Sequence, residues 1–317
     1  MHQKSTRVHW RTGLVAAAVV LAGASVAAPS AGAASFNLEG WATQGGGTTG
    51  GGSASPTTVT SASQFTTAVQ ASGAAVIRFS GTINLSSMTK VASNKTILGV
   101  GSGATITGQG LNIANASNVI VRNVNFRNWG DDAINVQYST RVWLDHNSFA
   151  NGSDGALDVK RASDYVTVSW NKFSSHDKTM LLGHSDDNAS EDTGKLRVSY
   201  HHNWFDGTNQ RHPRVRFGNP VHVYNNYYGG VTSYGVASTK DAGVLVEGNY
   251  FENTEDPFHR GEGSSPAAPL VARNNHFVNS GSGDQGGSVK AIPYSYALDA
   301  ASSVKSVVTG GAGTGKI

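Results

Sequence analysis

Residues 142–149 read VWLDHNSF, and the same pattern returns five more times along the chain. Alternating apolar residues lead to an asparagine and, two positions later, an aromatic ring. The other copies are VTVSWNKF (166–173), VSYHHNWF (198–205), VHVYNNYY (221–228), VLVEGNYF (244–251) and VARNNHF (271–277), and a degenerate copy, VIVRNVNF, occupies 119–126. A unit that recurs at this period is typical of stacked structural repeats.

The spacing of the copies indicates the kind of repeat. Successive aromatic positions, from Phe126 to Phe277, are 23, 24, 32, 23, 23 and 26 residues apart. Alternation of apolar residues is the period of a β-strand, and stacked strands place equivalent residues about 4.8 Å apart. We therefore predict an all-β fold, a right-handed parallel β-helix. A β-sandwich is the alternative, but a sandwich needs no asparagine at a fixed phase.

The recurrent asparagines are expected to form one ladder at a turn, passing amide hydrogen bonds from coil to coil. These residues are Asn147, Asn171, Asn203, Asn226, Asn249 and Asn275. The aromatic column should stack inside. Residues 61–72 predict a short N-terminal capping helix, because Ser61 and Gln64 form a capping box and Phe65 and Val69 share a face. Strands are expected from 76–79 and 96–100 onward, and the glycine-rich end TGGAGTGKI should be irregular.

The first 34 residues have the features of a secretory signal peptide. Lys4, Arg7 and Arg11 precede the apolar run LVAAAVVLAGASVAA and a small-residue end, which predicts cleavage near Ala33 or Ala34. The run is too short to span a membrane, so we expect a secreted, extracellular protein without a membrane anchor. Residues 35–317 are predicted to form a single β-helix domain.

Charge and cysteine content narrow the function classes. Removing the three basic residues of the signal peptide from a total of 24 leaves 21, against 21 acidic residues. A mature chain of zero net charge gives no reason to expect nucleic-acid binding. The chain has no cysteine, so neither disulfides nor a Cys-x-x-Cys site is possible. We expect a monomer, since a long solenoid supplies its own core.

A second strand in each coil carries the charged residues of interest. The segments AINV (133–136), ALDV (156–159), MLLG (180–183) and RVRF (214–217) suggest that Ile134, Leu157, Leu181 and Val215 are equivalent. In this alignment nearly the same position of successive coils is occupied by Asp131 or Asp132, Asp154, Lys178 and Arg211. A second shared position is occupied by Asp158 and Arg216. The interval of 32 residues between Phe173 and Phe205 contains the polar insertion SDDNASEDTGK (185–195), a candidate binding-face loop.

The aspartates lie at one end of this charged surface and the cationic side chains at the other, which points to a bound metal ion and a polyanionic substrate. Three neighbouring carboxylates repel unless a cation lies among them, and carboxylate oxygens suit Ca²⁺. An open Ca²⁺ beside cationic side chains would suit a uronate polymer and its cleavage by β-elimination. The residues alone nominate no base, because arginine side chains ordinarily stay protonated.

The segments VWLDHNSF (142–149), DGALDVKRASDYVTVSWNKFSSHDKTMLLGHSD (154–186) and RHPRVRFG (211–218) resemble the signature segments of the pectate lyase family. The resemblance extends from the glycine-rich lead-in GGTTGG to about residue 280. It implies that Asp132, Asp154 and Asp158 bind calcium, that Lys178 and Arg216 bind substrate, and that Arg211 is the catalytic base. The implied activity is endo-acting β-elimination of de-esterified polygalacturonate, with unsaturated oligogalacturonides as products.

Three other functions remain open at this point. A pectin lyase acting on methylated polymer would lack the calcium carboxylates, against which Asp154 and Asp158 argue. An inverting polygalacturonase would need two carboxyl groups about 6.5–9.5 Å apart and would leave the basic residues unexplained. A non-catalytic polysaccharide-binding β-helix would explain the repeat but not the ordered charges.

Overall fold

The repeated pattern folds as a strand, a turn at the asparagine, and a second strand in another sheet. In one copy, β11 (Thr140–Asp145) leads through Asn147 into β12 (Ser148–Ala150), which carries Phe149. A third strand, β13 (Leu157–Lys160), completes the coil before β14 (Asp164–Ser169) begins the next. The computed structural model describes residues 1–2 and 36–317, so the predicted signal peptide and its cleavage site lie almost wholly outside the described residues.

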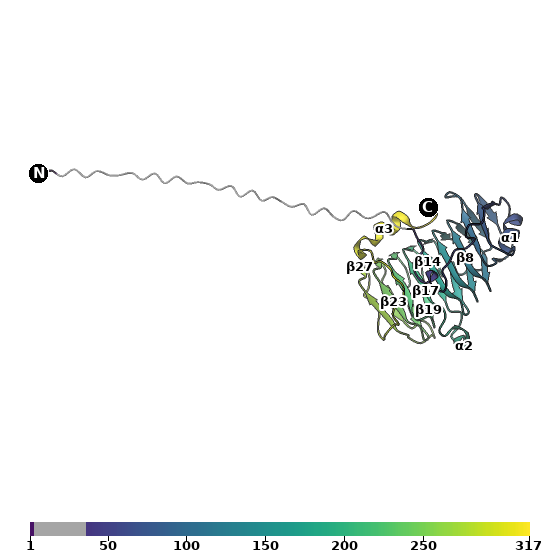
Figure 1. Cartoon of the computed structure of the whole chain (residues 1–317). Helices are drawn as coiled ribbons and strands as arrows, with labels where there is room; N and C mark the ends of the chain where they lie inside the picture. The colour runs from purple at the N-terminus through teal and green to yellow at the C-terminus, as the bar shows by residue number, and fades with distance from the viewer. Residues whose placement is uncertain (3–35) are drawn as a thin grey trace. The chain divides into compact units, whose positions relative to one another are not determined.

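Strands of successive coils pair in parallel to build three long sheets (Figure 1). The ten-stranded sheet contains β1 (Thr57–Thr58), β2 (Ala75–Phe79), β5 (Lys95–Gly99), β8 (Ser117–Arg122), β11, β14, β17 (Val198–His201), β20 (Val221–Tyr224), β23 (Val244–Glu247) and β26 (Leu270–Arg273). The nine-stranded sheet contains β3 (Thr82–Asn84), β6 (Thr105–Gly108), β9 (Asn125–Trp129), β12, β15 (Lys172–Ser174), β18 (Trp204–Asp206), β21 (Tyr227–Gly229), β24 (Tyr250–Glu252) and β27 (His276–Val278).

The third sheet has eight strands and carries the charged residues. It contains β4 (Thr89–Lys90), β7 (Leu111–Ala114), β10 (Ile134–Gln137), β13, β16 (Leu181–Leu182), β19 (Arg214–Arg216), β22 (Val236–Thr239) and β25 (Phe258–Arg260). Every pairing between these strands is parallel. The predicted all-β parallel β-helix is therefore confirmed.

The asparagine ladder forms as predicted. Each ladder side chain after Asn147 accepts through Oδ1 from the backbone N–H and the amide of the asparagine one coil before it, at 2.9–3.1 Å. The residue before each asparagine has a positive φ, including Trp170 at 54° and His202 at 55°. Bulky residues such as these two disfavour left-handed backbone, so at their positions the ladder bonds stabilise a turn that the residue alone would not adopt.

The aromatic column stacks in the interior. Ring centroids of neighbouring members lie 4.4–5.5 Å apart from Phe126 to Phe277. Every member from Phe126 to Phe251 is fully buried, whereas Phe277, at the last coil, is 39% exposed. Stacked rings at these distances contribute both apolar burial and favourable ring contacts.

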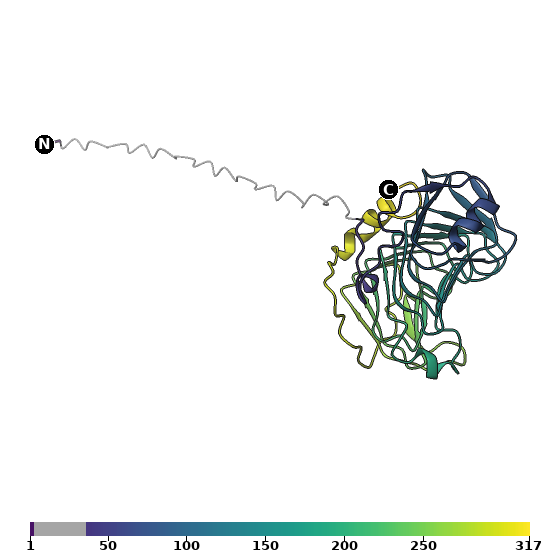
Figure 2. The ribbon, with the colours of Figure 1, turned by 45° about the vertical axis from the view of Figure 1, so that its right-hand side comes forward.

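The helices of the described chain are short, and one of them caps the solenoid. The predicted cap is α1 (Ala62–Gln70), in which Ser61 accepts from the Gln64 N–H and Phe65 and Val69 are buried. It lies at the N-terminal end of the stack, against β2, β3 and β4 (Figure 2). The remaining helices are η1 (Trp41–Thr43), α2 (Ala189–Asp192) in the long insertion, η2 (Ala301–Ser303) and α3 (Val304–Gly311). Within the described residues, no helix is long and apolar enough to cross a membrane.

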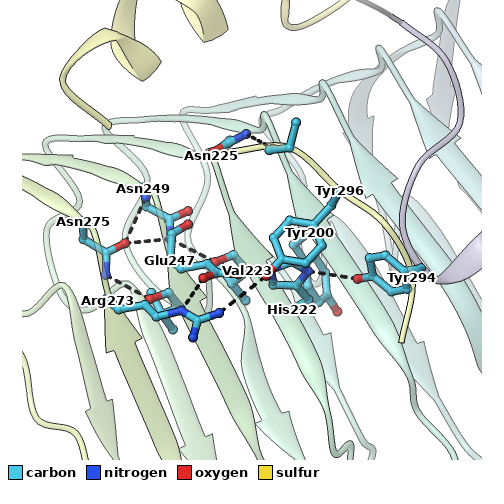
Figure 3. A network of polar contacts seen from close by, with 12 residues as sticks. Tyr200, His222, Val223, Asn225, Glu247, Asn249, Arg273, Asn275, Tyr294 and Tyr296 are labelled. Atoms are coloured by element: carbon cyan, nitrogen blue, oxygen red, sulfur yellow. Dashed lines mark hydrogen bonds and ion pairs between the residues drawn. The ribbon is translucent and has the colours of Figure 1, made fainter. Parts of the chain in front are cut away.

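The C-terminal end is less irregular than predicted. Helix α3 includes the first residues of the glycine-rich end and buries Val304 and Val308 against Tyr227 and Trp170. The preceding segment crosses the ten-stranded sheet, where Tyr296 donates to Glu247 at 2.6 Å and the Tyr294 hydroxyl lies 3.0 Å from His222 Nδ1 (Figure 3). These contacts, which connect distant residues, were not visible in the local composition.

Candidate active site

The candidate site lies on the outer face of the eight-stranded sheet and on the turns that lead into it. In β13, Leu157 and Val159 point into the core, so Asp158 and Lys160 point outward. In β19, Val215 is in the core, and Arg214 and Arg216 are on the outer face. Alternation along each strand thus presents charged residues from neighbouring coils on one surface.

The predicted alignment of these strands was wrong by one residue at β16. Ile134 pairs with Leu157, as predicted. Val159 pairs with Leu182, however, so the register at β16 differs by one residue from the predicted equivalence of Leu157 and Leu181. Leu181 in turn pairs with Arg214 and not with Val215. The sequence MLLG has three successive apolar residues, so alternation did not show which of them faces inward. A shift of one residue moves every side chain to the opposite face.

Correcting this register also corrects the predicted partner of Asp158. Asp158 accepts from the Leu181 N–H at 3.0 Å, and Leu181 in turn pairs with Arg214. Arg214, not Arg216, therefore shares the column of Asp158. Arg216 lies two residues farther along β19, where it pairs with Thr239.

Three aspartates on the turns before β10 and β13 form an acidic cluster. One carboxylate oxygen from each of Asp131, Asp132 and Asp154 lies within 4.8 Å of the other two. Asp131 is exposed, Asp154 is half-buried and Asp132 is buried. Asp131 therefore adds a carboxylate that the resemblance did not assign, while Asp132 and Asp154 meet as predicted.

Asp158 joins this cluster through Lys160, which the sequence interpretation missed. The Lys160 ammonium lies 2.7 Å from Asp132 Oδ2 and 3.5 Å from Asp158 Oδ2. Burial alone would lower the pKa of Lys160, but the carboxylates of Asp158 and Asp132 outweigh it and raise the pKa. The spacing of Asp158 and Lys160, two residues apart in a strand, was the signal that could have revealed the pair.

Burial raises the pKa of the Asp158 carboxyl to about 7, with Asp132 adding to the rise. Burial also raises the pKa of the Asp132 carboxyl, and the charge and hydrogen bond of Lys160 oppose this rise. Two buried carboxylates beside one lysine leave negative charge without an equal number of cations. Such a site is one that a further cation would stabilise.

Gly155 keeps open the space between these two carboxylates. A Cβ at this position would lie 2.6 Å from Asp158 Oδ1 and 2.7 Å from Asp132 Oδ1. Any side chain here would displace both carboxylates. The oxygen-only donor set and this open space fit Ca²⁺, which prefers carboxylate ligands and tolerates flexible geometry.

The basic side of the site begins one coil farther along. Lys178 Nζ lies 3.1 Å from Asp154 Oδ1, and its side chain is 37% exposed. The half-buried Arg211 follows in the next coil, close enough for its charge to oppose the rise in the pKa of Asp158. Its φ of 65° sets the turn into β19, and its carbonyl accepts from the Met180 N–H at 2.8 Å.

The adjacent His212 points away from this surface. It is fully buried beside Phe205, and its Nδ1 is 2.8 Å from the Tyr234 carbonyl oxygen. Burial lowers the pKa of His212 to about 3. His212 is therefore a neutral core residue and not a base on the charged surface.

Arg216, the remaining predicted site residue, pairs with the long insertion. It is 9% exposed, and its Nε donates to Asp186 Oδ1 at 2.6 Å. Asp186 belongs to the long insertion and was not singled out in the sequence. The structure thus brings together Asp132, Asp154, Asp158, Lys178 and Arg211, and places Arg216 beside the insertion.

The geometry can be compared with known proteins. A sequence profile described as Pectate lyase matches residues 11–317. The probable pectate lyase A of Aspergillus flavus is 39% identical over 266 residues, 80% of this chain and 81% of that relative. The chain belongs to the pectate lyase family. The pectate trisaccharide-lyase of Bacillus licheniformis, another relative, is 37% identical over 306 residues, 90% of this chain and 88% of that protein.

A solved structure supports the same assignment. The pectate lyase of Bacillus sp. N165, determined in complex with trigalacturonate, aligns with a TM-score of 0.81 and 31% identity over 88% of this chain and 99% of that one. This pectate lyase family member is thus an enzyme with the β-helix of its relatives. Its charged surface on the eight-stranded sheet is the candidate active site.

Proposed function

We propose that this enzyme is a secreted pectate lyase that cleaves de-esterified polygalacturonate within the chain by calcium-assisted β-elimination. The observation that carries the proposal is the acidic cluster, with Asp131, Asp132 and Asp154 within 4.8 Å of one another, one coil from Lys178. Relatives named pectate lyases, and a relative solved with trigalacturonate, support the substrate class.

The aspartates would hold the calcium ion. Asp132, Asp154 and Asp158 are the proposed ligands, with Asp131 as an additional carboxylate. When bound, calcium would neutralise a uronate carboxylate and so acidify the hydrogen on the adjacent carbon. Lys160 lies between Asp132 and Asp158 and reduces the repulsion between their carboxylates.

The basic residues would position the polymer and move the proton. The exposed Lys178 ammonium is placed to bind a uronate carboxylate. Arg211 would take the proton from C5. The C5–H electron pair would form the C4–C5 double bond as the C4–O4 bond breaks. The leaving oxygen would take a proton from water, and the hydroxide left behind would remove from Arg211 the proton that it took from C5.

The enzyme assay that tests this proposal uses polygalacturonate with and without a chelator. We expect an ultraviolet-absorbing unsaturated product with calcium present and none after exhaustive chelation. New reducing ends without unsaturated product would instead indicate a hydrolase. A faster initial rate on highly methylated pectin than on polygalacturonate would favour a pectin lyase.

Secretion, the monomeric state and internal cleavage belong to the same proposal. The N-terminal pattern of residues 1–34 supports export, and N-terminal sequencing of the protein from culture medium should start near residue 34 or 35. Retention of an intact N-terminus inside the cell would contradict export. Light scattering tests the monomer, and a rapid fall in polymer viscosity relative to product formed tests internal cleavage.

A further inference from the structure

The guanidinium of Arg216 is occupied by the protein itself. Its Nε donates to Asp186 Oδ1 at 2.6 Å, its Nη1 to the Gly183 carbonyl at 3.2 Å and its Nη2 to Ser265 Oγ at 3.3 Å. Its side chain is 11% exposed, against 37% for Lys178. Lys178 pairs with Asp154 but remains open to solvent, whereas a substrate carboxylate meets the guanidinium of Arg216 only after one of these partners leaves.

Asp186 is the partner that most resembles the substrate. It is a carboxylate bound to a guanidinium, which is the pairing that a uronate carboxylate would make. Ser265 Oγ donates to the same oxygen, Asp186 Oδ1, at 2.8 Å. With 30% of its side chain exposed, Asp186 lies at the boundary with solvent.

The insertion that carries Asp186 is anchored at its other end. In α2, Asp192 Oδ1 accepts from the Ala162 N–H at 2.7 Å, and Glu191 pairs with Arg161 at 3.2 Å. These contacts join the insertion to the preceding coil. Asp186 can thus leave Arg216 while α2 stays attached.

Gly183 allows the insertion to leave the sheet directly against Arg216. Its φ is 89°, and a Cβ at this position would lie 2.7 Å from the Arg216 Cβ. Only glycine combines this backbone conformation with this close approach. The contact between the insertion and Arg216 is therefore built into the backbone.

We propose that Asp186 is an internal competitor of the substrate: it holds Arg216 in the free enzyme and is displaced by a uronate carboxylate. The inference rests on the proposed pectate lyase function. It makes Asp186 a specificity-determining residue, because a free carboxylate can replace the Asp186 carboxylate on Arg216 and a methyl ester cannot. The exchange forms and breaks only hydrogen bonds and an ion pair.

The test compares steady-state kinetics of Asp186→Asn with the wild-type enzyme on polygalacturonate at saturating calcium. Loss of the competing charge should lower KM about fivefold without lowering kcat, the size expected for one partly exposed ion pair. Ser265→Ala, which removes one of the bonds that hold Asp186, should lower KM by a smaller factor. Asp187→Asn removes the same charge from an exposed neighbour and should leave both constants unchanged.

The outcomes separate this inference from the proposed function. An active wild-type enzyme whose Asp186→Asn variant has an unchanged or higher KM would overturn the exchange, and a higher KM would make Asp186 a positioning residue for Arg216. Absence of unsaturated product from the wild-type enzyme would overturn the proposed function itself. Circular dichroism and thermal unfolding of each variant would show that the insertion change leaves the β-helix folded.

Discussion

Asn203 accepts two hydrogen bonds from Asn171 through Oδ1, one from the backbone N–H and one from the amide, both at 3.1 Å. The two residues are 32 positions apart, whereas the other pairs of successive ladder asparagines are 23, 24 or 26 apart. The insertion of 185–195 is thus accommodated on the far side of the coil, and the ladder continues without a break.

The first prediction concerns the centre of this ladder. Asn203→Ala should lower the free energy of unfolding by roughly 3 kcal/mol, because it leaves buried donors of Asn171 and the Val168 carbonyl without partners. Asn275→Ala, at the end of the ladder and half-buried, should cost about 1 kcal/mol since water can replace its bonds. Urea unfolding measures both, and equal losses would contradict the cooperative ladder.

The second prediction concerns the proposed calcium ligands. Asp132→Asn and Asp154→Asn should each raise the calcium concentration for half-maximal activity more than about tenfold, since each removes a charged ligand. Asp131→Asn should have a smaller effect because Asp131 is exposed. Asp241→Asn, an exposed aspartate outside the cluster, is the control. A larger effect at Asp131 than at Asp132 would reassign the ligand.

The third prediction concerns Arg211. Arg211→Lys keeps a positive charge but loses the planar guanidinium, so turnover should fall at least about a hundredfold while oligogalacturonate binding stays within a factor of about three. Calorimetry measures binding and the unsaturated product measures turnover. Weaker binding with unchanged turnover of bound substrate would assign Arg211 to binding alone.

The fourth prediction concerns acid stability and the buried Glu247 of Figure 3. Burial would raise the pKa of Glu247, but hydrogen bonds from His222, Arg273 and Tyr296 outweigh it and lower the pKa to about 2. The folded state therefore keeps this carboxylate charged where the unfolded state already binds a proton. Its contribution is complete above about pH 4.5 and is lost as the pH falls toward about 2.

Glu247→Gln tests this contribution. At pH 7 the variant should be less stable than the wild type by about 3 kcal/mol, the value of this shift in pKa. The difference should shrink as the pH is lowered from 4.5 to 3, because protonation of Glu247 weakens the same bonds in the wild type. A difference that stays constant over this range would show that the charge of Glu247 does not stabilise the fold.

The sequence by itself determined the coil. The fixed phase of Val-x-Val, asparagine and aromatic residue predicted the parallel β-helix, the ladder and the buried column, because each repeat has the same local environment. It also predicted α1 from Ser61 and Gln64, whose capping contact is local. The stacking of one coil on the next, which the repeat predicted, places Asp132 beside Asp154 as expected.

Only the tertiary structure decided what lies between coils. Three successive apolar residues, Met180 to Leu182, left the register ambiguous, so the column of Asp158 was assigned to Arg216 when it belongs to Arg214. Lys160 lies on the same strand as Asp158, but its ion pair with Asp132 joins two coils. The ion pair of Asp186 with Arg216 likewise depends on how the insertion meets the next coil. Such contacts arise from side-chain packing across the solenoid, and a repeat pattern carries no information about them because the residues concerned are those that do not repeat.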